Sequence, residues 1–341
     1  MSDAVIENKE VTWEVLDIPV HGTMTAPAEK EARSAVILVA GSGPTDRNWC
    51  SPLLPGTNGS AKLLAEALAG QGFITLRYDK LASGPHVREN LSRFAGKISM
   101  QSHMEELAGA VETLVSERNV NKDSLFVLTN SEGAIHAVNY QLQAKSNRFG
   151  GLVLTGAPGR AVGEIGRSQI FNQIRSLPNA EILMRPYDEA ITEFLANKPI
   201  VMGPSLPEGI KLLLRSLENP YNLPFARELW NYSLPEYIAR VDEPMLVVIG
   251  KKDVQIDWKI DGGALEDATA QKTAVSFAYP ENANHVLKHE EMPIEKLTAD
   301  YVGANYNAPN AELDGEAADV IFNWLIEQHN RKAAGVTSYT G

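Results

Sequence analysis

The sequence predicts an α/β fold with a mostly parallel central sheet that is flanked by helices and carries an inserted helical cap. Continuous apolar runs such as residues 35–40 are typical of strands that are buried on both faces of a sheet. These runs alternate with amphipathic helical segments, and the order strand, helix, strand, helix implies parallel strands joined by crossover helices. The alternation is interrupted between residues 160 and 240, and this interruption predicts the cap.

The first half of the chain supplies most of the expected sheet. Residues 11–24 predict an antiparallel hairpin around a turn at 17–22. Ser102 and Glu105 have the spacing of a capping box and predict the start of a helix. The elements expected after the hairpin are, in order, a strand at 35–40, a helix at 60–69, a strand at 73–78, a helix at 102–117, a strand at 124–129, a helix at 132–143 and a strand at 151–155.

The second half begins with the cap. Residues 160–240 contain helical and loop patterns, many prolines and recurring apolar groups, but no strand pattern. The alternation resumes with strands at 245–249 and 273–279, followed by a closing helix that contains 320–326. We therefore expect residues 1–159 and 241–341 to form one core domain and residues 160–240 to form the cap.

A serine lies where a strand is expected to turn sharply into a helix. Ser131 has Thr129 two residues before it and Gly133 two residues after it, a partial match to the G-x-S-x-G pattern of a nucleophile elbow. Such a turn holds the hydroxyl clear of the backbone, and the helix N-terminus favours developing negative charge. The S-x-G pattern alone also fits a structural serine, whereas its place between strand and helix favours a nucleophile.

A carboxylate and an imidazole follow the last two expected strands. Asp253 lies just after the strand at 245–249, and His285 lies in the loop after the strand at 273–279. Because parallel strands end at one edge of the sheet, both side chains are expected beside Ser131. The chain order Ser, Asp, His is one of the known orders of a catalytic triad. Taken alone, Asp253 would be interpreted as a loop aspartate that caps a turn.

Other histidines and the single cysteine fit a catalytic role less well. His289 is expected to be a solvated neighbour of His285. His136 lies one turn into the helix after Ser131 and is expected to be carried away from the serine oxygen. Cys50 lies in a loop without an elbow, so a small buried thiol is the favoured interpretation.

Two backbone amides are expected to form an oxyanion hole. One belongs to Glu132, directly after the serine, and the other to Ser42 in the glycine-rich loop 41–44. The alternative is that the glycines of this loop only form a turn. The loop lacks the lysine and the spacing of a phosphate-binding P-loop, so nucleotide binding is not predicted.

Four motifs give the sequence a resemblance to a known family. They are GSGPTDR at 41–47, LRYDK at 76–80, NSEG at 130–133 and NHVLK at 284–288. With them the chain resembles bacterial esterases of the α/β-hydrolase superfamily that are related to serine-aminopeptidase-like hydrolases. The resemblance implies carboxylesterase activity on small acyl esters, with no cofactor.

The chain departs from the pattern of that family at two places. Thr129 stands where the family usually has glycine, and LASGP at 81–85 replaces a K-R-G-x-G-x-S loop. We expect the 81–85 loop to shape the mouth of the pocket. Asp46 and Arg47, next to the oxyanion loop, are expected to hold that loop through hydrogen bonds.

These residues predict a serine hydrolase that cleaves carboxylic esters through an acyl-enzyme intermediate. Ser131 would be the nucleophile, His285 the general base, and Asp253 the group that orients the imidazole. A lactonase, thioesterase, peptidase or acyltransferase would use the same triad, so these activities stay open as alternatives. Outside enzymes, the alternative is a catalytically silent ligand-binding protein of the same fold.

Composition argues against several other classes. The net charge of −12 does not suit nucleic-acid or anionic-membrane surfaces, which need clustered Lys and Arg. Residues 1–10 are polar and acidic, unlike a signal peptide, and no apolar run approaches the roughly 20 residues that span a bilayer. The single cysteine rules out an internal disulfide and fits a cytoplasmic location. No cofactor and no metal are predicted, the expected partner is a small-molecule ester, and the oligomeric state stays open.

Overall fold

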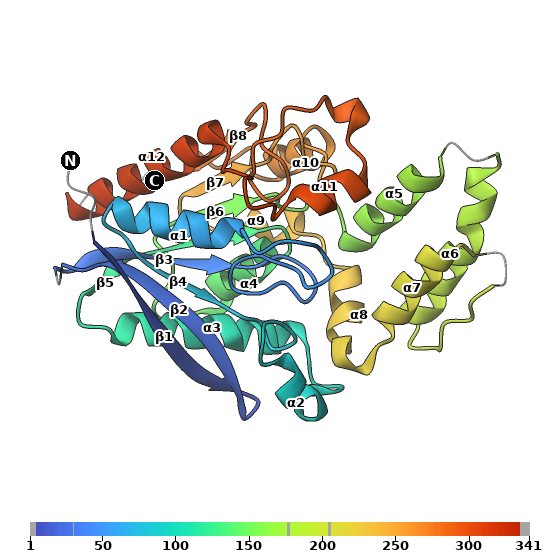
Figure 1. The fold of residues 1–341 in the computed structure, drawn as a ribbon, viewed down its shortest axis with the longest axis horizontal. Coiled ribbons are helices and arrows are strands. Elements are labelled where there is room, and N and C mark those ends of the chain that lie inside the picture. The colour runs from blue at the N-terminus through green and yellow to red at the C-terminus, as the bar shows by residue number, and fades with distance from the viewer. Residues whose placement is uncertain (1–4, 30, 176–177, 204–205, 335–341) are drawn as a thin grey trace.

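An eight-stranded sheet forms the centre of the molecule (Figure 1). The structure is a computed structural model that describes residues 5–29, 31–175, 178–203 and 206–334, so residues 1–4 of the polar N-terminal stretch lie outside the described residues. The strand order is β1-β2-β4-β3-β5-β6-β7-β8. The pairings β1–β2 and β2–β4 are antiparallel, and every later pairing is parallel. The predicted mostly parallel α/β fold is confirmed.

Every strand expected from the sequence is present, and the hairpin is longer than expected. Its two strands are joined by Leu16 and Asp17, which both have positive φ (55° and 59°), as a tight two-residue hairpin turn requires. The strands are β1 (Ile6–Val15), β2 (Ile18–Pro27), β3 (Arg33–Val39), β4 (Ile74–Tyr78), β5 (Val120–Asn130), β6 (Leu152–Thr155), β7 (Met245–Val248) and β8 (Val275–Ala278).

The expected helices of the core are also present, among others. The helices before β7 are α1 (Ser60–Gly70), α2 (Val87–Phe94), α3 (Met100–Ser116), α4 (Gly133–Gln143), α5 (Val162–Ile174), α6 (Ala180–Leu195), α7 (Glu208–Leu217), α8 (Phe225–Trp230) and α9 (Pro235–Ile238). Those after β7 are α10 (Ile260–Ala268), α11 (Ala299–Asn305) and α12 (Gly315–Ala333), and short 3₁₀ helices lie at Pro220–Asn222 and Ile294–Lys296.

The capping box predicted for Ser102 and Glu105 is wrong. Helix α3 begins at Met100, and Ser99 is its N-cap in an extended conformation. The Ser99 side chain accepts a hydrogen bond from the Ser102 amide, and the Ser102 hydroxyl accepts one from the Ser99 amide. Serine at the third helical position therefore serves as the return acceptor that the prediction assigned to a glutamate.

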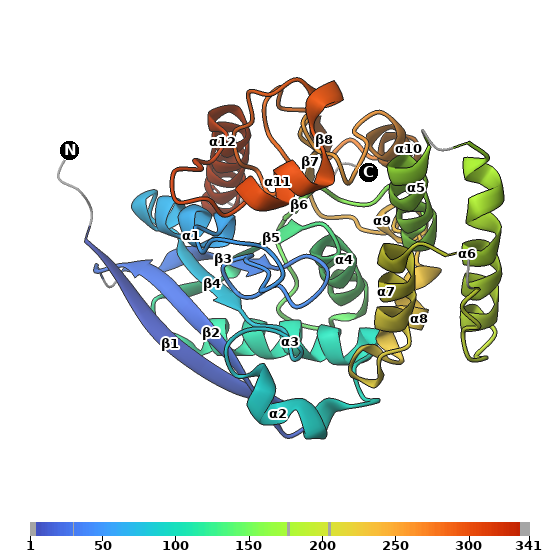
Figure 2. The same cartoon turned by 45° about the vertical axis from the view of Figure 1, so that its right-hand side comes forward.

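The two faces of the sheet are covered by different helices (Figures 1 and 2). Alternate residues of β3 divide between the two cores: Ile37 packs with α3 and α4, whereas Leu38 packs with α1 and α12. Because β3 is buried on both faces, its sequence is a continuous apolar run, and the strand was predicted from that run. The loops that leave the carboxyl ends of β5, β7 and β8 carry Ser131, Asp253 and His285.

The described residues between β6 and β7 form helices joined by loops, as expected. Figure 1 shows α5, α6 and α7 to one side of the sheet. Their apolar residues, among them Met184, Tyr187 and Phe194, form a cluster separate from the two cores of the sheet. Phe225 of α8 and Ile238 of α9 pack instead with the α3–α4 core. The division into a core and a cap with limits at 160 and 240 stays a prediction.

None of the helices in the described part of the chain is both long enough and apolar enough to cross a membrane.

Candidate active site

Ser131 forms the turn between β5 and α4. Its φ is 53°, a value that residues other than glycine rarely adopt. Its amide donates to the Thr155 carbonyl of the neighbouring strand at 2.8 Å. The strand ends one residue before it, and the helix begins two residues after it. The backbone at Ser131 thus has the strained strand-to-helix geometry of a nucleophile elbow, and the side chain is only half-buried.

The two residues that flank the elbow are accommodated in different ways. A Cβ atom at Gly133 would lie 2.6 Å from the Val39 carbonyl oxygen, so only glycine lets the end of β3 pass this close. Thr129 is fully buried, and its hydroxyl donates to the Val153 carbonyl at 3.3 Å while the Thr129 carbonyl accepts from the Thr155 hydroxyl at 2.7 Å. Threonine at 129 is therefore compatible with the turn.

The close approach at Gly133 predicts a loss of stability on adding one methyl group. The Gly133→Ala variant is expected to lower the free energy of unfolding by about 1–3 kcal/mol, because the elbow or β3 must shift. Gly209, in the first turn of α7, has open space around its Cβ position and is the matched control. Gly209→Ala is expected to be neutral or stabilising by up to about 1 kcal/mol. Urea unfolding measures both, and equal effects would contradict the steric argument.

Asp253 and His285 form a buried hydrogen-bonded pair. Asp253 Oδ2 lies 2.7 Å from His285 Nδ1, and the two side chains are 0% and 5% exposed. Asp253 Oδ1 accepts hydrogen bonds from the amides of Gln255 at 2.7 Å and Ile256 at 2.9 Å. The carboxylate is thus fixed by the loop after β7, and it directs its second oxygen to the imidazole. An ionised carboxylate only accepts, so His285 carries its proton on Nδ1 and leaves Nε2 free to accept one.

The structure brings Ser131 and His285 to the same edge of the sheet. Asn130, directly before the serine, donates from Nδ2 to the His285 carbonyl at 2.8 Å. A Cβ atom at Gly156 would lie 3.1 Å from the His285 ring, and Gly156 directly follows the residue that binds the Ser131 amide. Among the described residues, the serine hydroxyl and the imidazole share no hydrogen bond. Such bonds are often long before substrate binds.

Glu132 directly follows the serine, and Ser42 belongs to a loop that passes close to it. A Cβ atom at Gly41 would lie 3.1 Å from Ser131 Cβ, so the loop after β3 passes directly beside the serine. Within the part of the chain that the structure describes, neither the Ser42 amide nor the Glu132 amide donates to a protein acceptor. Both N–H groups are therefore available to an oxygen that develops negative charge at the serine.

Lys80 and Glu132 form a buried ion pair that also contacts the peptide group of the Ser42 amide. Lys80 Nζ donates to the Gly41 carbonyl at 2.6 Å and to Glu132 Oε1 at 2.9 Å. The same carboxylate oxygen accepts from His136 Nε2 at 3.0 Å. Burial alone would raise the pKa of Glu132, but the charge of Lys80 and the hydrogen bond from His136 lower that pKa well below its usual range. Burial also lowers the pKa of His136, which therefore acts as a neutral donor.

The loop that carries Ser42 is held by its charged neighbours, as predicted. Arg47 binds Asp79 through its backbone amide at 2.8 Å and through its guanidinium at 2.7 and 3.0 Å. Asp46 Oδ1 accepts from the amides of Asn48 and Cys50 at 2.8 and 2.9 Å. These bonds close the loop against the end of β4.

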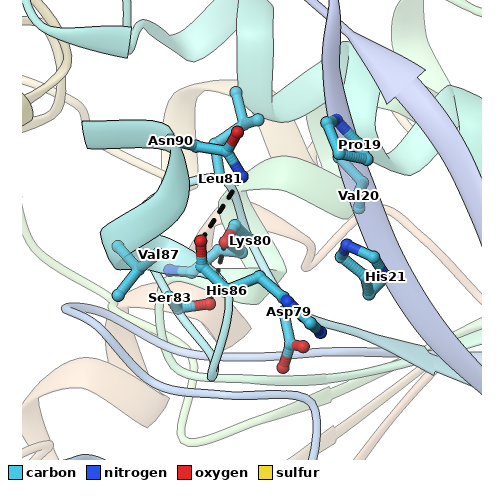
Figure 3. A pocket seen from close by; sticks show the side chains of 10 residues that line it. All are labelled: Pro19, Val20, His21, Asp79, Lys80, Leu81, Ser83, His86, Val87 and Asn90. Atoms are coloured by element: carbon cyan, nitrogen blue, oxygen red, sulfur yellow. Dashed lines mark hydrogen bonds between the residues drawn. The ribbon is translucent and has the colours of Figure 1, made fainter. Parts of the chain in front are cut away.

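A cavity of about 10 Å³ lies where the segment after β4 faces β2. Figure 3 shows the side chains that line it. Asp79, Lys80 and Ser83 line it on one side, and His21 lies on the other. Ser131, Asp253 and His285 are not among the residues that line this cavity. It is too small for an organic substrate. The shaping of a pocket mouth by residues 81–85 stays a prediction.

His289 and Cys50, the alternative histidine and the alternative nucleophile, have different surroundings. His289 is exposed and its Nδ1 lies 2.9 Å from Asp314 Oδ2. Cys50 is buried, and burial raises the pKa of its thiol to about 12, which keeps it protonated. Across the described residues, no three side chains of His, Cys, Asp or Glu gather in a way that could hold a metal ion.

Three residues that surround the site carried no functional interpretation from the sequence. Asn130 anchors the histidine loop, Gly156 makes room for the imidazole at a φ of +53°, and Lys80 donates to the Gly41 carbonyl and to the Glu132 carboxylate. Their motifs were visible, since Asn130 directly precedes the serine and Lys80 ends the LRYDK motif. Their partners lie 39 to 155 positions away in the chain, and only the fold identifies them.

The chain is similar to known proteins in sequence and in fold. No family model matches the sequence. The chain is similar to esterase EstD of Thermotoga maritima, with 24% identity over 322 residues that cover 93% of this chain and 68% of that protein. The crystal structure of the α/β hydrolase GrgF from Penicillium sp. sh18 matches with a TM-score of 0.54 and 13% identity, over 96% of this chain and 99% of that one.

A second solved structure matches over a smaller share of its own length. It is the acylaminoacyl peptidase of Pyrococcus horikoshii, with a TM-score of 0.49 and 14% identity over 82% of this chain, which spans only 38% of that protein. The fold assignment depends on the sheet topology and on the full-length match to GrgF. The chain has the α/β-hydrolase fold.

Proposed function

We propose that the protein hydrolyses carboxylic esters through an acyl-enzyme intermediate, with Ser131, His285 and Asp253 as the catalytic triad. The observation that carries the proposal is the buried Asp253–His285 pair, whose histidine loop is hydrogen-bonded to Asn130, the residue directly before a serine held at positive φ. A carboxylate fixed by two amides, an imidazole with a free Nε2 and an elbow serine are the three parts of a serine nucleophile system.

In the first step, Ser131 Oγ attacks the ester carbonyl carbon while His285 Nε2 takes the hydroxyl proton. The Asp253 carboxylate stabilises the imidazolium that forms, and the amides of Ser42 and Glu132 bind the oxyanion. When the tetrahedral intermediate collapses, His285 gives the proton to the leaving alkoxide, and the alcohol departs. In the second step His285 removes a proton from water, the hydroxide attacks the acyl carbon, and Ser131 leaves with that proton.

An ester is the substrate class that the comparisons favour. The curated relative is named an esterase and aligns with 93% of this chain. A lactonase, thioesterase, peptidase or acyltransferase would use the same steps and differ in the leaving group or in the acceptor of the acyl group. A panel of p-nitrophenyl esters, lactones, thioesters and peptide anilides separates these activities, and we expect the p-nitrophenyl esters of short acids to be cleaved fastest.

Labelling with a fluorophosphonate tests the nucleophile whatever the natural substrate is. The wild-type protein is expected to gain one phosphonyl group per chain, and peptide mapping is expected to place it on Ser131, because the proposed mechanism makes that serine the activated nucleophile. The Ser131→Ala variant is the control and should stay unlabelled. A wild-type protein that does not react would favour the ligand-binding alternative, and a label on another residue would remove Ser131 from the mechanism.

A further inference from the structure

Lys80 is a buried lysine that the proposed mechanism does not use. It directly follows Asp79 at the end of β4, and it is 4% exposed. Lysine is rarely buried unless it is paired, because desolvation of its charge is unfavourable. Here the charge is paired with Glu132, and the same nitrogen also donates to the Gly41 carbonyl. Lys80 therefore makes a hydrogen bond to the backbone of Gly41 in addition to its ion pair with Glu132.

The Gly41 carbonyl belongs to the same peptide group as the Ser42 amide. The cis bond found among the described residues is Leu223–Pro224, so the Gly41–Ser42 peptide is trans. In a planar trans peptide the C=O and N–H bonds point in opposite directions. A hydrogen bond of 2.6 Å from Lys80 to the carbonyl thus fixes the plane of the peptide and directs the Ser42 N–H away from Lys80. Polarisation by a neighbouring charge also strengthens the N–H as a donor.

The second acceptor of Lys80 belongs to the residue that carries the other free amide. Glu132 lies between Ser131 and the first residue of α4, and its carboxylate oxygen lies 2.9 Å from Lys80 Nζ. His136, one turn further along α4, donates to the same oxygen at 3.0 Å. The Glu132 side chain is thereby held from two sides, and the backbone of the residue is held with it.

We propose that Lys80 is a positioning residue that orients both oxyanion donors, Ser42 N–H through the Gly41 peptide and Glu132 N–H through the Glu132 carboxylate. This inference rests on the proposed function, because an oxyanion forms only if Ser131 attacks a carbonyl. One side chain then couples two loops that leave different strands, and both donors are in place before the reaction begins. Preorganised donors are worth more than donors that must turn during the reaction.

A purely structural role for Lys80 predicts a different outcome. If Lys80 served only to neutralise the buried Glu132, removing both charges together would restore the site. The Lys80→Met variant removes the amino group and keeps the chain length, and the Lys80→Met/Glu132→Gln double variant also removes the carboxylate charge. The double variant leaves no unpaired charge from this pair and keeps the Glu132 backbone amide, so it also serves if Lys80→Met alone folds poorly.

The experiment compares kcat, KM and the affinity for a trifluoromethyl ketone, which forms an oxyanionic adduct with an active serine. For Lys80→Met and for the double variant we expect kcat to fall by about 10²-fold to 10³-fold, the size of effect seen when one oxyanion donor is removed. The affinity for the ketone should fall by a similar factor, while KM changes by less than about threefold. Lys332→Met is the matched control, since Lys332 Nζ also donates to a backbone carbonyl, that of Asp123, far from the site.

The outcomes separate this inference from the proposed function. Full recovery of kcat in the double variant, or a loss confined to KM, would overturn the positioning role of Lys80 and leave the esterase proposal intact. A wild-type protein that neither cleaves esters nor reacts with fluorophosphonate would overturn both. A loss of kcat and of ketone affinity in both variants, with wild-type values in Lys332→Met, supports the inference.

Discussion

The Ser131→Ala variant is expected to lose ester hydrolysis by about 10⁵-fold or more in kcat, the scale seen when the serine of a triad is removed. The hydroxyl at residue 131 is the proposed attacking group, and alanine retains nothing that can form the acyl-enzyme. The residual rate then comes from substrate binding and the oxyanion donors alone. Hydrolysis of a p-nitrophenyl ester under substrate saturation measures the loss.

The same variant should stay folded, which makes the result interpretable. Ser131 is only half-buried, and its backbone amide, which alanine keeps, makes the hydrogen bond to Thr155. We expect the free energy of unfolding in urea to change by less than about 1 kcal/mol. A variant that retains more than a tenth of the wild-type kcat with an unchanged unfolding curve would contradict the role of Ser131.

The Asp253→Asn variant is expected to lower kcat by about 10⁴-fold through a change of imidazole tautomer. Asp253 Oδ1 accepts from two backbone amides, so the amide oxygen of an asparagine would take that place. Its NH₂ group would then face His285 Nδ1 and donate to it. The imidazole would carry its proton on Nε2 and could not accept one from Ser131.

Asp257 provides a matched control for this substitution. Asp257 Oδ1 also accepts from two backbone amides, those of Lys259 and Ile260, but the side chain is exposed and bonds to no imidazole of the described residues. Asp257→Asn should leave kcat within about twofold of the wild type. Comparable losses in the two variants would attribute the effect to the loops after β7 and not to the imidazole. Steady-state kinetics on one p-nitrophenyl ester suffices for the comparison.

The sheet could be predicted from the sequence because burial on both faces leaves a local pattern. The run at 35–40 is apolar at every position, since neighbouring residues face two different cores. Helix α10 was not predicted, because the segment IDGGALEDA holds two glycines and has little apolar periodicity. The start of α3 was predicted at the wrong residue, since Ser99 and Ser102 are both good capping residues and the sequence does not rank them.

The sequence likewise predicted one part of the candidate site and not the other. Ser131, Asp253 and His285 follow strands, and the shared edge of a parallel sheet predicts that they meet. The supporting contacts depend on side chains that reach across the chain, and no local pattern encodes them. Lys80 is the clearest case: its spacing to Gly41 and to Glu132 carries no recognisable motif, and its role depends on the register of β3, β4 and β5.

The hydrogen bond from Asn130 to the His285 carbonyl joins residues that are 155 positions apart. During synthesis on the ribosome, the elbow can therefore form long before the loop that completes it has been made. Under the proposed mechanism, a nascent chain that ends before residue 285 would carry the serine without its base, and we expect it to lack hydrolytic activity while its sheet assembles. In that mechanism, the order of the residues along the chain delays reactivity until the loop after β8 has joined the elbow.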